Sequence, residues 1–276
     1  MGRRRAATPL LTLAALLFLA FTLFPVYWAV VSSLESGSEL FQVTYWPAAP
    51  QWQNYTAAFE QQPFGRNILN SFIVAALTVG LSLGLAVFAA YALGRVAFRG
   101  RTLLLYAVLA ITMFPQVAVL TGMFELINWL GLYDNWLGLA LSYMLFTLPF
   151  AVWVMTSYMR DIPAEIEDAA LSDGATPRQV VTMVLLPMVR PGLLTAALLA
   201  FVAAWNEFLF ALTFTLTNKA RTVPVAIALI SGASEYELPW GRIMAASVIV
   251  TVPLVLLAVA FQRRIVSGLT AGAVKT

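Results

Sequence analysis

Residues 168–187 read DAALSDGATPRQVVTMVLLP and form a charged, polar interruption between two long apolar runs. Just before it, Pro163 suits the first position of a helix, where its missing N–H costs nothing. Glu165 and Asp168 then place negative charge at the positive end of the helix dipole. Gly174 suits the C-terminal stop, because glycine tolerates a positive φ. The stretch therefore begins with a short helix that ends at Gly174.

A second short helix is predicted directly after the first. Thr176 can cap its N-terminus, Pro177 fits its first position, and Gln179 completes a Thr-x-x-Gln capping box. Pro187 closes the segment, because proline cannot continue a helix. The local sequence thus predicts two short helices that meet in an elbow.

The composition points to a membrane protein. Of the 276 residues, 61% are hydrophobic and 11% are charged, whereas an average soluble domain is about 25% charged. The mean hydropathy is +0.84. The sequence holds no cysteine and no histidine, which argues against thiol or imidazole catalysis and leaves no expected metal site. The basic residues flank apolar runs, so nucleic acid is not an expected partner and the lipid bilayer is.

Six apolar runs are long enough to cross a bilayer, which takes about 20 residues in a helix. The first follows MGRRR and is longer than the apolar region of a signal peptide, so we interpret it as a retained anchor. We expect an all-α polytopic membrane protein made of one transmembrane domain over 1–276. The predicted spans are 10–31, 68–93, 103–126, 137–159, 193–216 and 243–261.

The distribution of Lys and Arg predicts the orientation of these spans. Twelve of the 16 basic residues fall in connections on one side of the predicted membrane, and an excess of basic residues marks the cytoplasmic side. Both termini and the elbow, within a connecting segment at 160–191, are therefore expected in the cytoplasm. The twelve are Arg3, Arg4, Arg5, Arg95, Arg99, Arg101, Arg160, Arg178, Arg190, Arg263, Arg264 and Lys275.

The spacing within the elbow resembles a known signature. An acidic residue and two alanines (168–170) are followed, after three residues, by Gly174 and, after nine more, by Val-Leu-Leu-Pro at 184–187. This pattern resembles the EAA signature of the inner-membrane permease subunits of binding-protein-dependent ABC importers. Asp168 replaces the signature's glutamate, and Val184 replaces its isoleucine.

The resemblance extends over most of the chain. The stretches FGRNILNSFIVA, IPAEIEDAALSDGA, LLPMVRPGL and FVAAWNEFLFALTF look like the carbohydrate branch, the maltose-type six-span permease of the type I importer fold. The resemblance implies that the elbow is a coupling helix seated on a cytoplasmic ATPase subunit. The implied coupling residues are Glu165, Asp168, Ala169, Ala170, Leu171, Gly174, Leu186 and Pro187.

The same resemblance implies how the transporter is assembled and driven. A permease of this class transports a di- or oligosaccharide such as maltose together with a second permease, two ATPase subunits and an external solute-binding protein. The sequence contains no Gly-x-x-x-x-Gly-Lys-Ser/Thr loop for holding ATP. We therefore expect no cofactor on this chain, no enzymatic activity of its own, and ATP use by the partner subunits in the cell inner membrane.

Polar residues in the fifth predicted span are candidates for the transport path. Trp205, Asn206 and Glu207 lie deep within it, where an ionisable side chain is costly and faces a cavity or a partner by default. Trp205 can stack on a sugar ring while Asn206 and Glu207 bond to its hydroxyls. The alternative is that Glu207 ties the fifth span to a neighbouring helix.

Three other functions are weighed against the sugar permease. A permease for amino acids or ions carries the same elbow signature, so the signature alone leaves it open. A secondary transporter usually has internal repeats and several intramembrane charges, and we find no convincing repeat. A membrane-embedded enzyme lacks support because the spans contain no pair of carboxylates at catalytic spacing.

Overall fold

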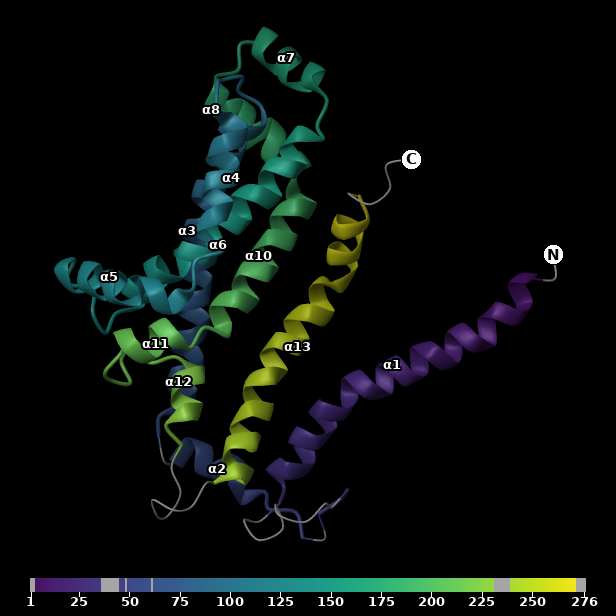
Figure 1. The fold of residues 1–276 in the computed structure, drawn as a ribbon, viewed down its shortest axis with the longest axis vertical. Helices are drawn as coiled ribbons and strands as arrows, with labels where there is room; N and C mark the ends of the chain where they lie inside the picture. Colours follow the sequence, from purple (N-terminus) through teal and green to yellow (C-terminus); the bar gives the residue numbers. More distant parts are fainter. Residues whose placement is uncertain (1–2, 36–44, 48, 61, 231–238, 272–276) are drawn as a thin grey trace. The chain divides into compact units, whose positions relative to one another are not determined.

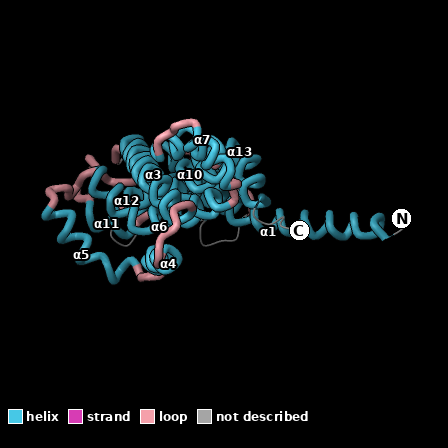
Figure 2. Tube along the Cα trace, turned by 90° about the horizontal axis from the view of Figure 1, so that it is seen from above, coloured by secondary structure: helices cyan, strands magenta, loops and turns pink. Residues whose placement is uncertain are grey.

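The structure, a computed structural model, describes residues 3–35, 45–47, 49–60, 62–230 and 239–271, all of them in helices and loops (Figures 1 and 2). The predicted all-α fold class is confirmed. The elements are α1 Arg3–Ser33, α2 Gln53–Glu60, α3 Phe64–Gly94, α4 Arg101–Ile111, α5 Gln116–Trp129, α6 Trp136–Arg160, α7 Ala164–Ser172, α8 Pro177–Gln179, the π-helix η2 Val180–Leu185, α9 Leu186–Met188, α10 Arg190–Trp205, α11 Leu209–Phe214, α12 Val223–Ala228 and α13 Trp240–Ala271.

The chain divides into two compact units. The first comprises residues 1–65 and 226–253, and the second comprises residues 66–225 and 254–276. In the first unit the side chain of Asn54, on α2, donates hydrogen bonds to the carbonyls of Ser33 (2.9 Å), the last residue of α1, and of Glu35 (3.1 Å) just after it. The second unit contains the elbow and the polar residues of the fifth predicted span, so it holds the candidate sites.

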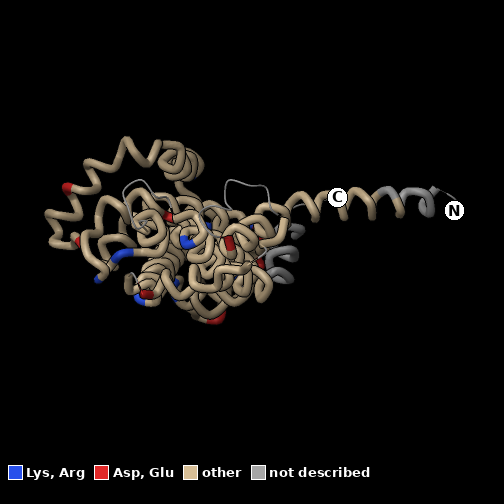
Figure 3. Tube along the Cα trace, turned by 90° about the horizontal axis from the view of Figure 1, so that it is seen from below, with Lys and Arg blue, Asp and Glu red and all other residues tan. Residues whose placement is uncertain are grey.

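Four helices are long and apolar enough to cross a membrane without interruption: Leu11–Ser33, Phe64–Gly94, Trp136–Arg160 and Trp240–Phe261. Two further candidates are bent pairs, α4 with α5 at 92° and the Pro177–Met188 segment with α10 at 81°. If each bent pair counts as one span, the described residues contain six. Figure 3 shows how few charged residues lie along the helices, as a lipid environment requires.

The third predicted span, 103–126, is not one continuous helix. α4 ends at Ile111 and α5 begins at Gln116, with Pro115 in an extended conformation (φ −59°, ψ 129°) between them. Proline has no N–H for a helical hydrogen bond and disfavours the helical conformation in the residue before it. The range 103–126 therefore holds two helices bent by 92° at Pro115, a residue whose type and position in the sequence indicate such a break.

The fifth predicted span, 193–216, is also interrupted. α10 ends at Trp205, and α11 begins only at Leu209. Between them Phe208 adopts φ −120°, and the Glu207 side chain accepts the N–H groups that begin α11. A carboxylate that satisfies these free donors competes with continuation of the preceding helix. The prediction of one helix to residue 216 was wrong for this reason.

Buried apolar side chains hold the second unit together in three clusters. One cluster joins α3, α6 and the elbow, and we call it the elbow cluster. Its buried members are Val87, Ala90, Met155, Met159, Ile162, Val180, Val181, Leu185 and Val189. In this unit α7 and α8 lie at the opposite end from α11 (Figure 1).

At the end of the unit away from the elbow, amide and carboxylate side chains hold the loop after α11. Asn70, on α3, donates to the carbonyls of Asn218 (3.1 Å) and Arg221 (2.9 Å) and accepts from the Trp136 indole (3.1 Å). Asp134 accepts from the N–H of Leu216 (3.1 Å). These bonds satisfy main-chain groups that no helix pairs.

Gly192, in the first turn of α10, lets α10 approach α6 closely. A methyl group at this position would lie 2.4 Å from Cδ2 and 2.5 Å from Cγ of Tyr158. Cγ lies next to the main chain, so the ring cannot swing clear without a new rotamer. We expect Gly192→Ala to lower the free energy of unfolding by about 1–3 kcal/mol through overpacking.

Thermal unfolding of the purified subunit in detergent measures this effect. The matched control is Gly80→Ala in α3, where an added methyl group meets nothing within 4 Å. The control is expected to be neutral or slightly stabilising, because alanine favours the helix. Equal melting temperatures for Gly192→Ala and Gly80→Ala would contradict the close approach.

Candidate functional site

The first arm of the elbow, α7, is bounded by the residues that the sequence indicates. Pro163 directly precedes its first helical residue, Ala164, and Gly174 follows it with φ +86°. The N–H groups of Gly174 and Ala175 donate to carbonyls of the last turn of α7 at 3.0 Å. The local signals at both ends therefore position α7, which agrees with the predicted glycine stop.

The second arm starts with the predicted capping box. The Thr176 N–H donates to the Gln179 side chain at 2.8 Å, and the Gln179 N–H donates to the Thr176 hydroxyl at 3.4 Å. The arm then continues as the π-helix η2, which the sequence analysis did not predict. Pro187 has no N–H to donate to the carbonyl of residue 183. The N–H of Leu186, the residue before it, donates to the Val181 carbonyl, five residues back. This wider turn suits the residues before a proline.

The two faces of α7 have different surroundings. Ile166 and Ala170 pack against the elbow cluster, as does Leu186 from the second arm. Asp168 and Ala169 face outward, and Leu171 is 43% exposed. An exposed leucine beside a small residue and a carboxylate is a surface that another protein can cover.

The other residues implied for coupling divide in the same way. Glu165 and Gly174 are exposed, whereas Pro187 is half-buried in the second arm. The predicted set therefore contains an outward group on and beside α7 and an inward group that supports it. The coupling role of these residues stays a prediction.

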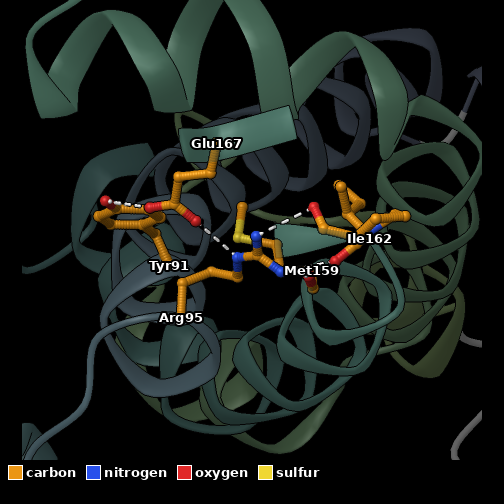
Figure 4. Close-up of polar contacts among 6 residues, drawn as sticks. Tyr91, Arg95, Met159, Ile162 and Glu167 are labelled. Atoms are coloured by element: carbon orange, nitrogen blue, oxygen red, sulfur yellow. Dashed lines mark hydrogen bonds and ion pairs between the residues drawn. The ribbon is translucent and has the colours of Figure 1, made fainter. Parts of the chain in front are cut away.

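An arginine outside the elbow anchors it to the helical bundle. The Arg95 side chain, just after the end of α3, forms an ion pair with Glu167 on α7, with Nε and Oε2 2.7 Å apart (Figure 4). Its guanidinium also donates to the carbonyl of Ile162 at 2.6 Å. The Tyr91 hydroxyl donates to the second oxygen of Glu167 at 2.8 Å. The two ends of the ion pair are 9% and 15% exposed, so the contact lies mostly out of solvent.

The anchoring roles of Tyr91, Arg95 and Glu167 were not predicted from the sequence, in which Arg95 marks only the cytoplasmic side. Arg95 and Glu167 are 72 residues apart, and no periodicity or motif relates positions at that separation. An arginine just past an apolar run and an acidic residue next to the signature were the available signals, and neither specifies a partner.

The polar residues at the end of α10 adopt three different environments. Trp205 is 3% exposed and stacks on Phe201, with ring centroids 5.7 Å apart. The Asn206 side chain is exposed and donates to the Val202 carbonyl at 2.8 Å. Glu207 is 6% exposed. Of the three predicted path residues, Asn206 is thus the accessible one.

Glu207 caps the N-terminus of α11. One carboxylate oxygen accepts from the Phe210 N–H at 2.8 Å and the other accepts from the Ala211 N–H at 3.1 Å. The Tyr143 hydroxyl of α6 is close enough to interact with this carboxylate, but it makes no hydrogen bond of acceptable geometry to any described residue. Within the described ranges, no three acidic side chains gather as metal ligands. Both N–H donors lie within the fifth predicted span itself, so Glu207 has a local structural task, and its role in the path or in a tie to a neighbouring helix stays a prediction.

Comparisons with known proteins place this arrangement of helices in a family. Residues 82–270 match the family described as binding-protein-dependent transport system inner membrane component. The chain is 40% identical to the trehalose transport system permease protein SugB of Mycobacterium tuberculosis, and the match covers all of both chains. It is 40% identical to the trehalose/maltose transport system permease protein MalG of Thermococcus litoralis over 96% of each chain.

Another relative and a solved structure agree with these matches. The chain is 41% identical to the sulfoquinovosyl glycerol transport system permease protein SmoH of Agrobacterium fabrum, over 97% of this chain and 94% of that one. The fold matches a chain of a bacterial ABC transporter involved in the import of the polysaccharide alginate, with a TM-score of 0.77 and 22% identity over 95% and 98% of the two chains. The chain belongs to the family of binding-protein-dependent transport system inner membrane components, the permease subunits of ABC importers.

Proposed function

We propose that the chain is the permease subunit of an ABC importer that carries a sugar across the cell inner membrane, a di- or oligosaccharide such as maltose. The observation that carries this proposal is the near full-length identity of about 40% to relatives named as permeases for trehalose, for trehalose and maltose, and for sulfoquinovosyl glycerol. Each of these named substrates contains a sugar ring. The shared chemistry is recognition of sugar hydroxyl groups.

We propose further that the outward face of α7 is where ATP-driven movement enters the chain. Two ATPase subunits bind and hydrolyse ATP, a second permease completes the path, and an external solute-binding protein delivers the sugar. The exposed Leu171 and the acidic residues beside it support contact with an ATPase subunit. Asp168 and Glu165 offer partners for basic side chains on such a subunit. The chain itself is a transport subunit and holds no nucleotide.

The break between α10 and α11 is the proposed contribution of this chain to the sugar path. Discontinuous membrane helices commonly line substrate sites, because their ends present polar groups within the bilayer. Asn206 is the exposed member of the predicted path residues. Trp205 and Glu207 shape the break, one through stacking on Phe201 and the other through capping of α11.

A permease for amino acids is a less favoured alternative. The chain of a methionine ABC transporter matches this fold with a TM-score of 0.55 over 74% of the present chain, at 17% identity. A match at that identity concerns the fold only. The high-identity relatives are sugar permeases, and we therefore propose sugar as the substrate class.

Contact between α7 and an ATPase subunit can be tested by cross-linking. The chain contains no cysteine, so Leu171→Cys can carry a single photoreactive maleimide. In membranes that contain the co-expressed ATPase of a sugar importer, we expect it to cross-link to that subunit, with a yield that changes when ATP is added. The matched control is Ile166→Cys on the inward face of the same helix, which should give no cross-link. Failure of Leu171→Cys to label any ATPase subunit would overturn the coupling proposal.

Variants at the break separate a path residue from a structural one. Asn206→Ala should reduce uptake of labelled disaccharide with little change in melting temperature, because an exposed side chain usually contributes within about 0.5 kcal/mol to stability. Glu207→Gln puts an amide group against one of two N–H donors, so it should lower stability by about 1–3 kcal/mol. Normal uptake by Asn206→Ala, measured in the assembled complex, would remove Asn206 from the path.

The proposed orientation has its own test. With both termini and the elbow in the cytoplasm, the loop after α11 faces the outside. Lys219→Cys, which is exposed in that loop, should react with a membrane-impermeant maleimide in intact cells. Ser172→Cys, exposed on α7, should react only after the cells are permeabilised. The reverse pattern of labelling would invert the topology.

A further inference from the structure

The contacts of Arg95 join three parts of the second unit at one point. Its side chain begins just beyond α3, bonds to the main chain between α6 and α7, and ends on a carboxylate of α7. The carbonyl acceptors in that connection are Ile162 at 2.6 Å and Pro163 at 3.3 Å. The carboxylate on α7 is that of Glu167, with Nε and Oε2 2.7 Å apart. A single side chain therefore fixes α7 relative to α3 and to the end of α6.

We propose that Arg95 is the positioning residue that passes movement of α7 on to α3 and α6. The inference rests on the proposed coupling function and adds the intramolecular route that this function needs. Arg95 touches neither sugar nor ATP in this role. It makes the elbow and the cytoplasmic ends of two spans move as one body.

The geometry of the guanidinium suits such a task. Its nitrogens are held in a planar fork, so the directions of the bonds to Glu167 and to the Ile162 carbonyl are fixed together. Hydrogen bonds between charged groups are roughly twice as strong as neutral ones, and this pair is largely shielded from solvent. A displacement of α7 would lengthen several of these bonds at once. Lysine offers the charge without the fork, so it would hold α7 less firmly.

Neighbouring contacts extend the joint. The Tyr91 hydroxyl bonds to the other oxygen of Glu167 at 2.8 Å, one helical turn before Arg95. From the opposite side Arg160, at the end of α6, donates to the Leu93 carbonyl near the end of α3 at 3.1 Å. α3 and α6 are thus tied to each other at the place where Arg95 ties both to α7.

Apolar packing alone would hold the elbow in place without fixing its direction. Ile166 and Ala170 pack into the elbow cluster with Val180 and Val181 of the second arm. Apolar contacts are non-directional, so a helix held only by them can slide or tilt under load. Removal of the Arg95 bonds should therefore leave α7 packed against the elbow cluster but with its direction less firmly fixed. Such a variant can impair the transmission of movement without preventing folding.

The test compares ATP hydrolysis with sugar transport in the complete complex. The permease pair and its ATPase subunits are reconstituted in proteoliposomes with the solute-binding protein and labelled disaccharide. For Arg95→Gln we expect near-normal ATP hydrolysis and at least about tenfold more ATP hydrolysed per sugar moved, because α7 then lacks the directional bonds that tie it to α3 and to the end of α6. Arg95→Lys should show an intermediate ratio at unchanged melting temperature.

The matched control is Arg99→Gln, which removes an exposed arginine four residues further along. It should leave the ratio of ATP to sugar unchanged. If this variant raises the ratio as much as Arg95→Gln does, the effect is a general one of lost charge and the inference is overturned. A normal ratio in Arg95→Gln would overturn it directly. If Arg95→Gln does not assemble, the ratio of ATP to sugar is measured for Glu167→Gln, which changes the other partner with little change in shape. The same outcomes then support or overturn the inference. Failure of both variants to assemble would assign the ion pair to folding and reject the inference.

The Leu171→Cys cross-link keeps this inference separate from the proposed function. If Leu171→Cys, with Arg95 in place, cross-links to an ATPase subunit and Arg95→Gln shows a normal ratio of ATP to sugar, only the role of Arg95 is rejected. Absence of that cross-link would instead reject the coupling function on which the inference rests. In the expected case, Arg95→Gln combined with Leu171→Cys still cross-links to the ATPase subunit, while Arg95→Gln hydrolyses at least about tenfold more ATP per sugar moved.

Discussion

Main-chain polar groups need hydrogen-bond partners in places that water does not reach, and the rest of the structure depends on this constraint. A continuous helix meets the requirement by itself, but each break in a membrane helix frees donors and acceptors. At three such places in the described part of the second unit a polar side chain supplies the partner. Glu207 accepts the N–H groups of α11, Arg95 donates to carbonyls before α7, and Asn70 donates to carbonyls after α11. The few polar residues that the composition allows are thus used where the helices stop.

The elbow shows how one short helix can serve two surfaces. The inward face of α7 is held by apolar packing and by the ion pair of Glu167, while its outward face presents Leu171. The proposed coupling role requires a helix that is accessible on one side and rigidly attached on the other. Packing provides most of the attachment area, whereas the charged hydrogen bonds provide its direction, because only the latter depend strongly on angle.

The break after α10 combines stability with access in a similar way. Glu207 occupies both of its carboxylate oxygens in capping α11, so the break persists without a bound ligand. Asn206, the preceding residue, stays exposed. A polar position in a membrane span is expensive, and here the cost of burying the carboxyl group is offset by the two main-chain N–H groups that it accepts. A fixed opening in a helix can then present a polar side chain at little further cost.

The sequence by itself determined the elements whose signals lie within a few residues of one another. Gly174 and the Thr176–Gln179 capping box were predictable because positive φ and capping bonds depend only on near neighbours. The apolar runs predicted the all-helical membrane fold in the same local way, and the break at Pro115 is equally local, whereas the break at Glu207 was not predicted. Only the tertiary structure decided that Arg95 meets Glu167, and it also decided which face of α7 is buried. Those contacts join positions many residues apart, and their energy exists only when α3, α6 and α7 have already packed, so no local pattern of residues encodes them.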